Sequence, residues 1–173
     1  MKRLLHSMLI AASLILVGCI KDDRETPEDT TLVKIGQVAP DFTTQLYPNG
    51  EVKLSSLRGN VVLLTLWDPG CETCQKEIAV VQKRIIDYFQ GEEFRYLPIA
   101  RDQDYDAIDS FCQEKGYTFP IGLDPERKIY HLYATKYVPR SFIIDREGVI
   151  RTIDVEYELD NLDTIVKTIE KML

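Results

Sequence analysis

Seven consecutive residues, Val61 to Trp67, are apolar except for Thr65. A run of this length without alternating polar positions is typical of a strand that is buried on both faces of a sheet. Such a strand needs a covering layer on each side, so the run predicts a layered α/β domain. It argues against a sheet with one face in water.

Strand and helix patterns alternate on both sides of this run. Two loosely alternating segments, 41–46 and 51–54, flank Asn49-Gly50 and predict a hairpin. Further elements are expected as a helical turn at 55–58, a helix at 72–90 ended by Gly91, a strand at 94–100, a helix begun by Asp104 or Asp106 and ended by Gly116, a short helix at 124–133, strands at 141–144 and 149–155, and an amphipathic helix at 161–173. The predicted fold class is therefore α/β, a mixed sheet sandwiched by helices with an N-terminal hairpin extension.

The first eighteen residues have the pattern of an export signal. Lys2 and Arg3 precede a mostly apolar stretch that is too short to span a membrane and has the length of a secretory apolar region. The stretch ends in Leu16-Val17-Gly18-Cys19, which resembles the lipobox of bacterial lipoproteins, and this resemblance implies cleavage before Cys19 and lipidation of its thiol. The alternative is a plain secretory signal in which Cys19 is incidental.

The expected domains are a lipoprotein signal peptide at 1–18, a flexible tether at 19–33 and one folded domain at 34–173. Charged residues and Pro27 without aromatic residues predict a solvated tether. Lys21-Asp22-Asp23 resembles a surface-export signal of one group of Gram-negative bacteria. The expected location is the bacterial cell envelope, lipid-anchored and either facing the periplasm or on the outer-membrane surface. The formal net charge of −7 makes nucleic acid an unsuitable partner.

The reactive site is predicted at Cys71-Glu72-Thr73-Cys74, between the buried strand and the long helix. Two cysteines in a first helical turn can close a small disulfide with little rearrangement. Unpaired N–H groups and the dipole at the helix start favour a thiolate on Cys71, and the thiolate is the attacking species in disulfide exchange. Cys74 lies deeper and is expected to resolve the mixed disulfide.

Trp67, three further residues and the Cys71-x-x-Cys74 pair resemble the thioredoxin superfamily, and most closely its ResA- and TlpA-like thiol–disulfide oxidoreductases. The segment 138–145 resembles the family strand that follows a cis proline. The resemblance implies a thioredoxin-like fold from about Ile35 to Leu173 and a substrate-binding surface formed by Trp67, Val138 and Pro139. In Cys-Glu-x-Cys-x-x-Glu, Glu77 resembles the family glutamate that lies near the thiols, with a surface glutamate as the alternative.

The sequence also departs from the family pattern. Gly70 stands where tryptophan commonly precedes the first cysteine, and Thr65 stands where thioredoxin has a buried aspartate. Glu72 is either a thiol modulator or a solvated residue. Glu72 and Glu77 both oppose a thiolate at Cys71, so we expect the Cys71–Cys74 pair to be a reducing couple. Cys112 is expected as a core thiol and His131 as a surface or packing residue.

The expected function is thiol–disulfide exchange with exported protein substrates through Cys71 and Cys74. An upstream electron donor is expected to supply the electrons. No cofactor beyond that disulfide and no metal is expected, because a zinc site would need two more ligands than the pair, and only Cys112 and His131 remain. The alternatives are a static disulfide on a surface binding module, a copper-delivery protein, and a peroxiredoxin-like peroxidase. Peroxidase chemistry needs a proline and a threonine at set positions before the reactive cysteine, and this sequence has Leu64 and Asp68 at those positions.

Overall fold

The computed structural model describes residues 26, 28–155 and 162–173 of the 173-residue chain. The expected signal peptide, Cys19 and the first part of the tether lie outside the described residues. The strands are β1 (Thr43–Tyr47), β2 (Glu51–Lys53), β3 (Val61–Trp67), β4 (Phe94–Arg101), β5 (Ile121–Asp124), β6 (Arg140–Ile144) and β7 (Ile150–Val155). The helices are α1 (Glu72–Val81), α2 (Tyr105–Lys115), α3 (Tyr130–Tyr133) and α4 (Leu162–Glu170), with a 3₁₀ segment η1 (Leu54–Leu57) and a π segment η2 (Gln82–Ile86).

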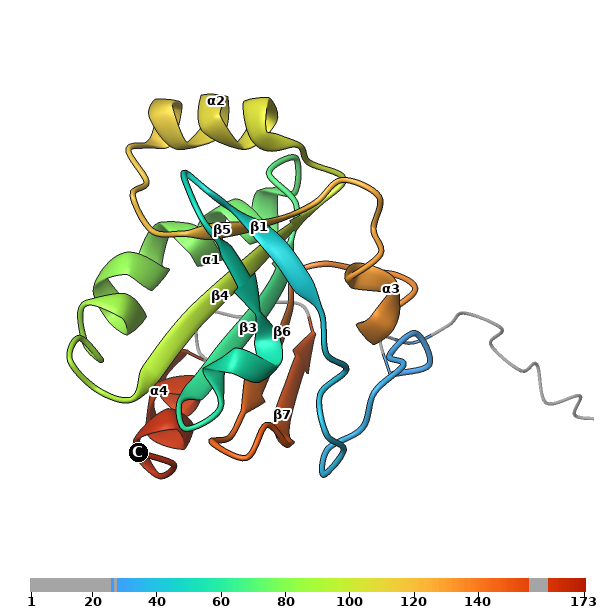
Figure 1. Cartoon of the computed structure of the whole chain (residues 1–173), viewed down its shortest axis with the longest axis vertical. Helices are drawn as coiled ribbons and strands as arrows, with labels where there is room; N and C mark the ends of the chain where they lie inside the picture. Colours follow the sequence, from blue (N-terminus) through green and yellow to red (C-terminus); the bar gives the residue numbers. More distant parts are fainter. Residues whose placement is uncertain (1–25, 27, 156–161) are drawn as a thin grey trace, which may run out of the picture.

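The seven strands form one mixed sheet in the order β2-β1-β5-β4-β3-β6-β7 (Figure 1). β3 pairs in parallel with β4 and antiparallel with β6, and β4 pairs in parallel with β5. The hairpin β1–β2 and the late pair β6–β7 are antiparallel, as expected. The α/β mixed sheet predicted from the sequence is confirmed.

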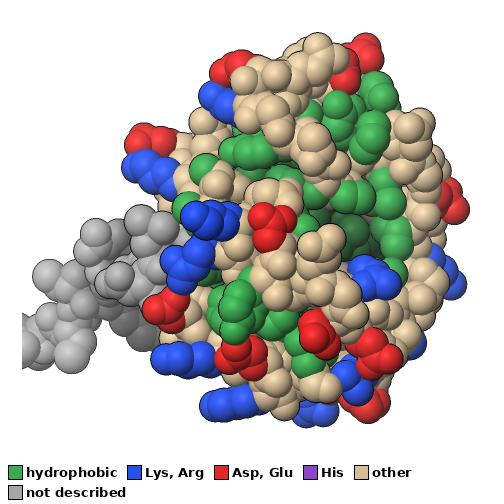
Figure 2. Space-filling view, turned by 90° about the vertical axis from the view of Figure 1, so that its left-hand side faces the viewer, with side chains coloured by type: hydrophobic (Ala, Val, Ile, Leu, Met, Phe, Trp, Pro, Cys, Tyr) green, Lys and Arg blue, Asp and Glu red, His purple; other side chains and the backbone are tan. Residues whose placement is uncertain are grey.

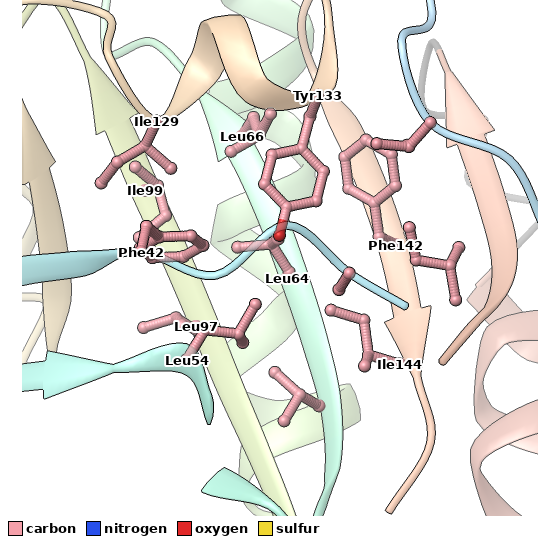
Figure 3. Packing of buried hydrophobic residues seen from close by; sticks show 14 of the residues in the cluster. Phe42, Leu54, Leu64, Leu66, Leu97, Ile99, Ile129, Tyr133, Phe142 and Ile144 are labelled. Atoms are coloured by element: carbon pink, nitrogen blue, oxygen red, sulfur yellow. The ribbon is translucent and has the colours of Figure 1, made fainter. Parts of the chain in front are cut away.

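Every residue of β3 is buried, because its two faces belong to different cores. Leu64 and Leu66 point into a core closed by α3, η1 and the chain before β1, where Tyr133 and Phe142 also pack (Figure 3). Val61 and Leu63 point to the opposite face, which α1, η2 and α4 cover. The continuous apolar run is therefore explained by a strand in the middle of a three-layer domain.

The predicted helix at 72–90 is interrupted. α1 ends at Val81, and η2 follows with one wider turn, in which the Asp87 N–H donates to the Gln82 carbonyl at 2.8 Å. The Gln82 side chain also donates to Asp87 at 2.6 Å. The wider turn keeps Ile85 and Phe89 in the core, where the apolar spacing had placed them.

In the segment 121–133 the sequence analysis missed one element and placed the start of another wrongly. β5 was not expected, because a four-residue strand containing Gly122 gives little periodic signal. The short helix begins at Tyr130 instead of Asp124, because the Asp124 carboxylate accepts the N–H groups of Ile129 and Tyr130. Residues 125–129 therefore form turns that lead to α3.

The last residues of the predicted tether pack against the domain, contrary to the expectation of a solvated segment. Thr30 and Val33 are 1% and 3% exposed. The Leu32 N–H donates to the Tyr133 carbonyl at 2.8 Å, and the Thr135 N–H donates to the Thr30 carbonyl at 2.9 Å. These bonds hold the segment beside α3 (Figure 1), where backbone pairing outweighs its polar composition.

Candidate active site

Cys71 is the N-cap residue of α1. β3 ends at Trp67, and the turn that follows is held by the Asp68 carboxylate, which accepts the Gly70 N–H at 2.8 Å. Cys71 has an extended backbone, and its sulfur accepts the N–H of Cys74 at 3.3 Å. A cysteine thus occupies the position usually taken by Ser, Thr, Asp or Asn. Its sulfur faces the helix start, which is the arrangement that stabilises a thiolate.

The two thiols differ in exposure. Cys71 is partly exposed, whereas Cys74 is 0% exposed, and both are free thiols in the structure. Burial, together with the neighbouring Cys71 thiol, raises the pKa of Cys74 well above its usual range. A substrate protein can therefore reach only the Cys71 sulfur, and the Cys74 sulfur lies beneath it as a protonated thiol.

Val138 and Pro139 lie opposite Cys71. They immediately precede β6, which pairs with β3, so the sheet brings them to the end of the strand that leads into α1. The Cys71 thiol donates to the Val138 carbonyl at 3.7 Å, and the Val138–Pro139 peptide bond is cis. The cis proline implied by the family resemblance is confirmed, and the structure brings three of the predicted site residues together across 67 positions of sequence.

Trp67 lies under the site and does not line its surface. Its side chain is 0% exposed, and its ring packs against Phe111 of α2 at a centroid distance of 5.4 Å. A chain that docks on the surface would meet Cys71 and Val138 before it met the indole. Trp67 therefore supports the site from below, in contrast to the expectation that it lines the binding surface.

Glu77 is a buried carboxyl behind the cysteine pair. It is 4% exposed and accepts the Ser141 hydroxyl at 3.1 Å, and the Ser141 hydroxyl also bonds Thr65 at 2.9 Å. Burial raises the pKa of Glu77 from its ordinary value of 4.5 to about 7, and the charge of Asp154 adds to the rise while the Ser141 hydroxyl opposes it. A buried carboxyl with a pKa of about 7 close to a buried thiol is suited to proton transfer.

Thr65 and Ser141 were not predicted as partners of Glu77. They are register neighbours on β3 and β6, so their hydroxyls meet on the α1 side of the sheet. The signal in the sequence was Thr65 itself, a polar residue inside a strand that is otherwise apolar and buried on both faces. Ser141 carried no such signal, because it lies at the start of a strand.

Arg101 adds a cation to the rim of the site. Its Nε lies 3.7 Å from the Asp68 carboxylate, and its guanidinium lies 4.8 Å above the Tyr130 ring. Arg101 ends β4, the parallel neighbour of β3, so its position follows from strand order and no local motif predicted it.

The remaining candidate residues take ordinary positions. Glu72 is exposed and pairs with Lys76 at 2.7 Å, which lowers its pKa. Cys112 is 1% exposed in the core beside Trp67, as expected, and burial raises its pKa to about 11. His131 is exposed on α3 against the Tyr130 ring.

Apolar side chains gather on the side of the molecule shown in Figure 2, which is the left-hand side of Figure 1. A groove lined in part by Phe89, Phe94, Tyr96 and Phe119 opens between the η2–β4 and α2–β5 connections. Neither Cys71 nor Val138 lines it.

Within residues 26, 28–155 and 162–173, no group of three or more His, Cys, Asp or Glu side chains is placed to hold a metal ion, and no helix is long and apolar enough to cross a bilayer.

A cysteine at a helix N-terminus, a covered second cysteine and a facing cis proline on a sheet with helices on both sides define a thioredoxin-like thiol–disulfide oxidoreductase. The family model described as AhpC/TSA matches residues 35–153, and the chain belongs to this family.

Proteins that are similar to this chain carry names of the same class. The thiol-disulfide oxidoreductase ResA of Bacillus thuringiensis (strain Al Hakam) is 27% identical over 142 residues, which cover 82% of each chain. A solution structure of a proposed protein disulfide isomerase from Bacteroides thetaiotaomicron is 35% identical, with a TM-score of 0.78 over 83% of this chain and 92% of the other. A crystal structure of a proposed thiol:disulfide interchange protein DsbE from Chlorobium tepidum is 25% identical, with a TM-score of 0.72 over 81% and 98%.

Proposed function

We propose that this oxidoreductase reduces disulfides of exported proteins, with Cys71 as nucleophile and Cys74 as resolving thiol. The observation that carries the proposal is the difference in exposure between the two sulfurs, one reachable at a helix N-terminus and one covered beneath it. Val138, whose carbonyl lies against Cys71, and Pro139 form the surface on which the client chain docks.

The reaction follows from this arrangement. The Cys71 thiolate attacks one sulfur of the client disulfide, the S–S bond breaks, and one client thiolate leaves. Cys74 then loses its proton and attacks the Cys71 sulfur, which releases the second client thiolate and forms the Cys71–Cys74 disulfide. Two electrons pass to the client, and an upstream dithiol reductant restores the pair.

Glu77 is the proton acceptor for Cys74 in this scheme. Its buried carboxyl has a pKa of about 7, so near neutral pH it can both take up and release a proton. Burial, the Cys71 thiol and the Glu77 carboxyl raise the pKa of Cys74, which disfavours a thiolate on that residue and suits a reducing couple. A measured reduction potential near that of DsbA, about −120 mV, would contradict the reducing direction.

Trapping tests the cysteine roles. Cys74→Ser removes the resolving thiol, so we expect client proteins to accumulate as mixed disulfides on Cys71 that dithiothreitol releases. The matched control is Cys112→Ser, which retains the Cys71–Cys74 pair and should turn over without accumulating adducts. Failure of Cys74→Ser to form any reducible adduct with a disulfide-bonded client would contradict the assignment.

We also propose that lipid on Cys19 holds the domain at the cell envelope. Support comes from the lipobox-like Leu16-Val17-Gly18-Cys19 and from the short distance along the chain to the domain. Thr30 is packed on the domain, and an extended chain covers at most about 3.6 Å per residue. The active site would then work within a few tens of ångströms of the membrane. Cys19→Ser should move the protein from the membrane to the soluble fraction, and unchanged membrane association would contradict the anchor.

A further inference from the structure

Arg140 is a fully buried arginine directly after the cis proline. Its side chain is 0% exposed. Its Nε donates to the Lys136 carbonyl at 2.9 Å and to the Tyr137 carbonyl at 3.3 Å, both in the loop that leads to Val138. The Tyr130 hydroxyl donates to the same Tyr137 carbonyl at 2.9 Å. One guanidinium therefore holds the backbone on the approach to the proposed docking surface.

The other end of the guanidinium faces the N-terminal segment. Its two terminal nitrogens donate to the side-chain hydroxyls of Thr30 and Thr31. Thr31 also forms a β-bridge with Ala134, just before the same loop. The chain that enters the domain from its N-terminal side is thus bonded to the docking loop through both backbone and side chain.

A buried guanidinium depends on these bonds. Leaving a buried charged donor unsatisfied is costly, so loss of an acceptor disfavours the position that Arg140 occupies. Thr30 and Thr31, far from Cys71 in sequence, supply acceptors at one end of the guanidinium, and the loop carbonyls of Lys136 and Tyr137 supply acceptors at the other. A change at the threonines therefore reaches the loop through Arg140.

We propose that Arg140 is a positioning residue that couples the Thr30–Thr31 segment to the docking loop 136–139, so that the N-terminal segment sets how tightly a client chain is held. The coupling rests on the proposed function, because it acts on the surface where the client docks. It leaves the attack of Cys71 on a small disulfide unchanged, since that step needs no docked chain. The segment that would carry the membrane anchor then becomes part of client recognition.

The test uses the full chain with Thr30→Val and Thr31→Val combined. Valine keeps the shape of threonine and removes the hydroxyl acceptors. Insulin serves as the protein client, and 5,5′-dithiobis(2-nitrobenzoate) serves as the small disulfide. We expect kcat/KM for insulin to fall roughly tenfold, mostly through KM, while the rate with the small disulfide stays within about twofold of wild type. Thr43→Val, an exposed threonine on β1, is the matched control and should change neither rate.

A second variant and a second measurement keep the test decisive if the threonine variant is unstable. Arg140→Lys retains the charge and loses the fork of donors, and we expect the same KM increase, not additive with the threonine changes. Amide hydrogen exchange in 134–138 should accelerate in both variants, while exchange in α2 stays unchanged.

Equal losses with insulin and with the small disulfide, or additive effects of the two variants, would overturn the coupling. An unchanged KM for insulin with protected loop amides would overturn it as well. Wild-type protein that reduces neither substrate would instead contradict the proposed function, so the two failures are distinguishable.

Discussion

At the scale of single residues, Glu77 is a buried acid whose ionised form is disfavoured in the folded protein. Its carboxyl is 4% exposed and its pKa is raised to about 7, chiefly by burial. Ionising it inside the protein therefore costs free energy that a surface glutamate would not cost. Stability alone favours removal of a buried acid of this kind, which supports the proton-transfer role proposed for Glu77.

Replacing Glu77 with glutamine should make stability less sensitive to pH. The folded pKa of about 7 lies above the ordinary 4.5, so the carboxyl costs nothing below about pH 4.5 and costs most above pH 7. Relative to wild type, the free energy of unfolding of Glu77→Gln should rise by about 2–3 kcal/mol between pH 5 and pH 8. Urea unfolding at both pH values measures this.

Glu72→Gln is the control for that experiment. Glu72 is exposed and its pKa is lowered by Lys76, so it stays ionised across this pH range in both folded and unfolded states. Its substitution should give the same difference from wild type at pH 5 and pH 8. A Glu77→Gln variant that behaves like the Glu72 control would show that Glu77 is ionised normally.

At the scale of elements, the N-cap of α2 could be narrowed to two residues from the sequence, and the structure identified which one it is. Asp104 and Asp106 were both candidate caps. The structure assigns the cap to Asp104, whose carboxylate accepts the Ala107 N–H at 3.0 Å, and ends the helix at Gly116 with φ 73°. α2 in turn places Phe111 against Trp67, so the cap stabilises the underside of the active site.

Asp104→Ala should lower the free energy of unfolding by about 1 kcal/mol, the usual loss for a capping side chain. Asp106→Ala is the matched control, because it lies in the first turn without the cap bond and should cost only a few tenths of a kcal/mol. Chemical denaturation of both variants measures the difference. Equal losses would mean that the cap bond contributes nothing beyond charge at the helix N-terminus.

At the scale of the whole molecule, β3 separates two cores. Leu63 belongs to the core under α1 and α4, and Leu64 belongs to the core under α3 and η1. They are neighbours in sequence, and both are almost completely buried, at 2% and 0% exposure. The strand that leads to Cys71 is therefore packed from both sides.

Leu63→Ala and Leu64→Ala should each destabilise the fold by about 2–5 kcal/mol, because each leaves a cavity in a closed core. Leu132→Ala, on exposed α3 surface, should change the free energy of unfolding by less than about 0.5 kcal/mol. Urea denaturation of the three variants provides the comparison. A Leu63 variant as stable as the Leu132 control would show that the helical layer on that face is not packed.

The fold class and the central residues of the site were determined by local patterns in the sequence. The run Val61–Trp67 predicted a buried strand, and Cys71-x-x-Cys74 at the following helix predicted the thiol pair, because strand burial and helix capping depend on residues within a few positions. The family resemblance added Val138 and Pro139, and the structure places the Val138 carbonyl against Cys71 and makes the Val138–Pro139 bond cis.

Only the tertiary structure decided which distant groups share that site. Strand order brings Ser141 beside Thr65 and beneath Glu77, buries Trp67, and joins Arg140 to Thr30 and Thr31. No local pattern encodes these contacts, because a hydrogen bond or a buried charge depends on what lies opposite in space. The same reason explains why the short strand β5 and the packed end of the predicted tether emerged only with the fold.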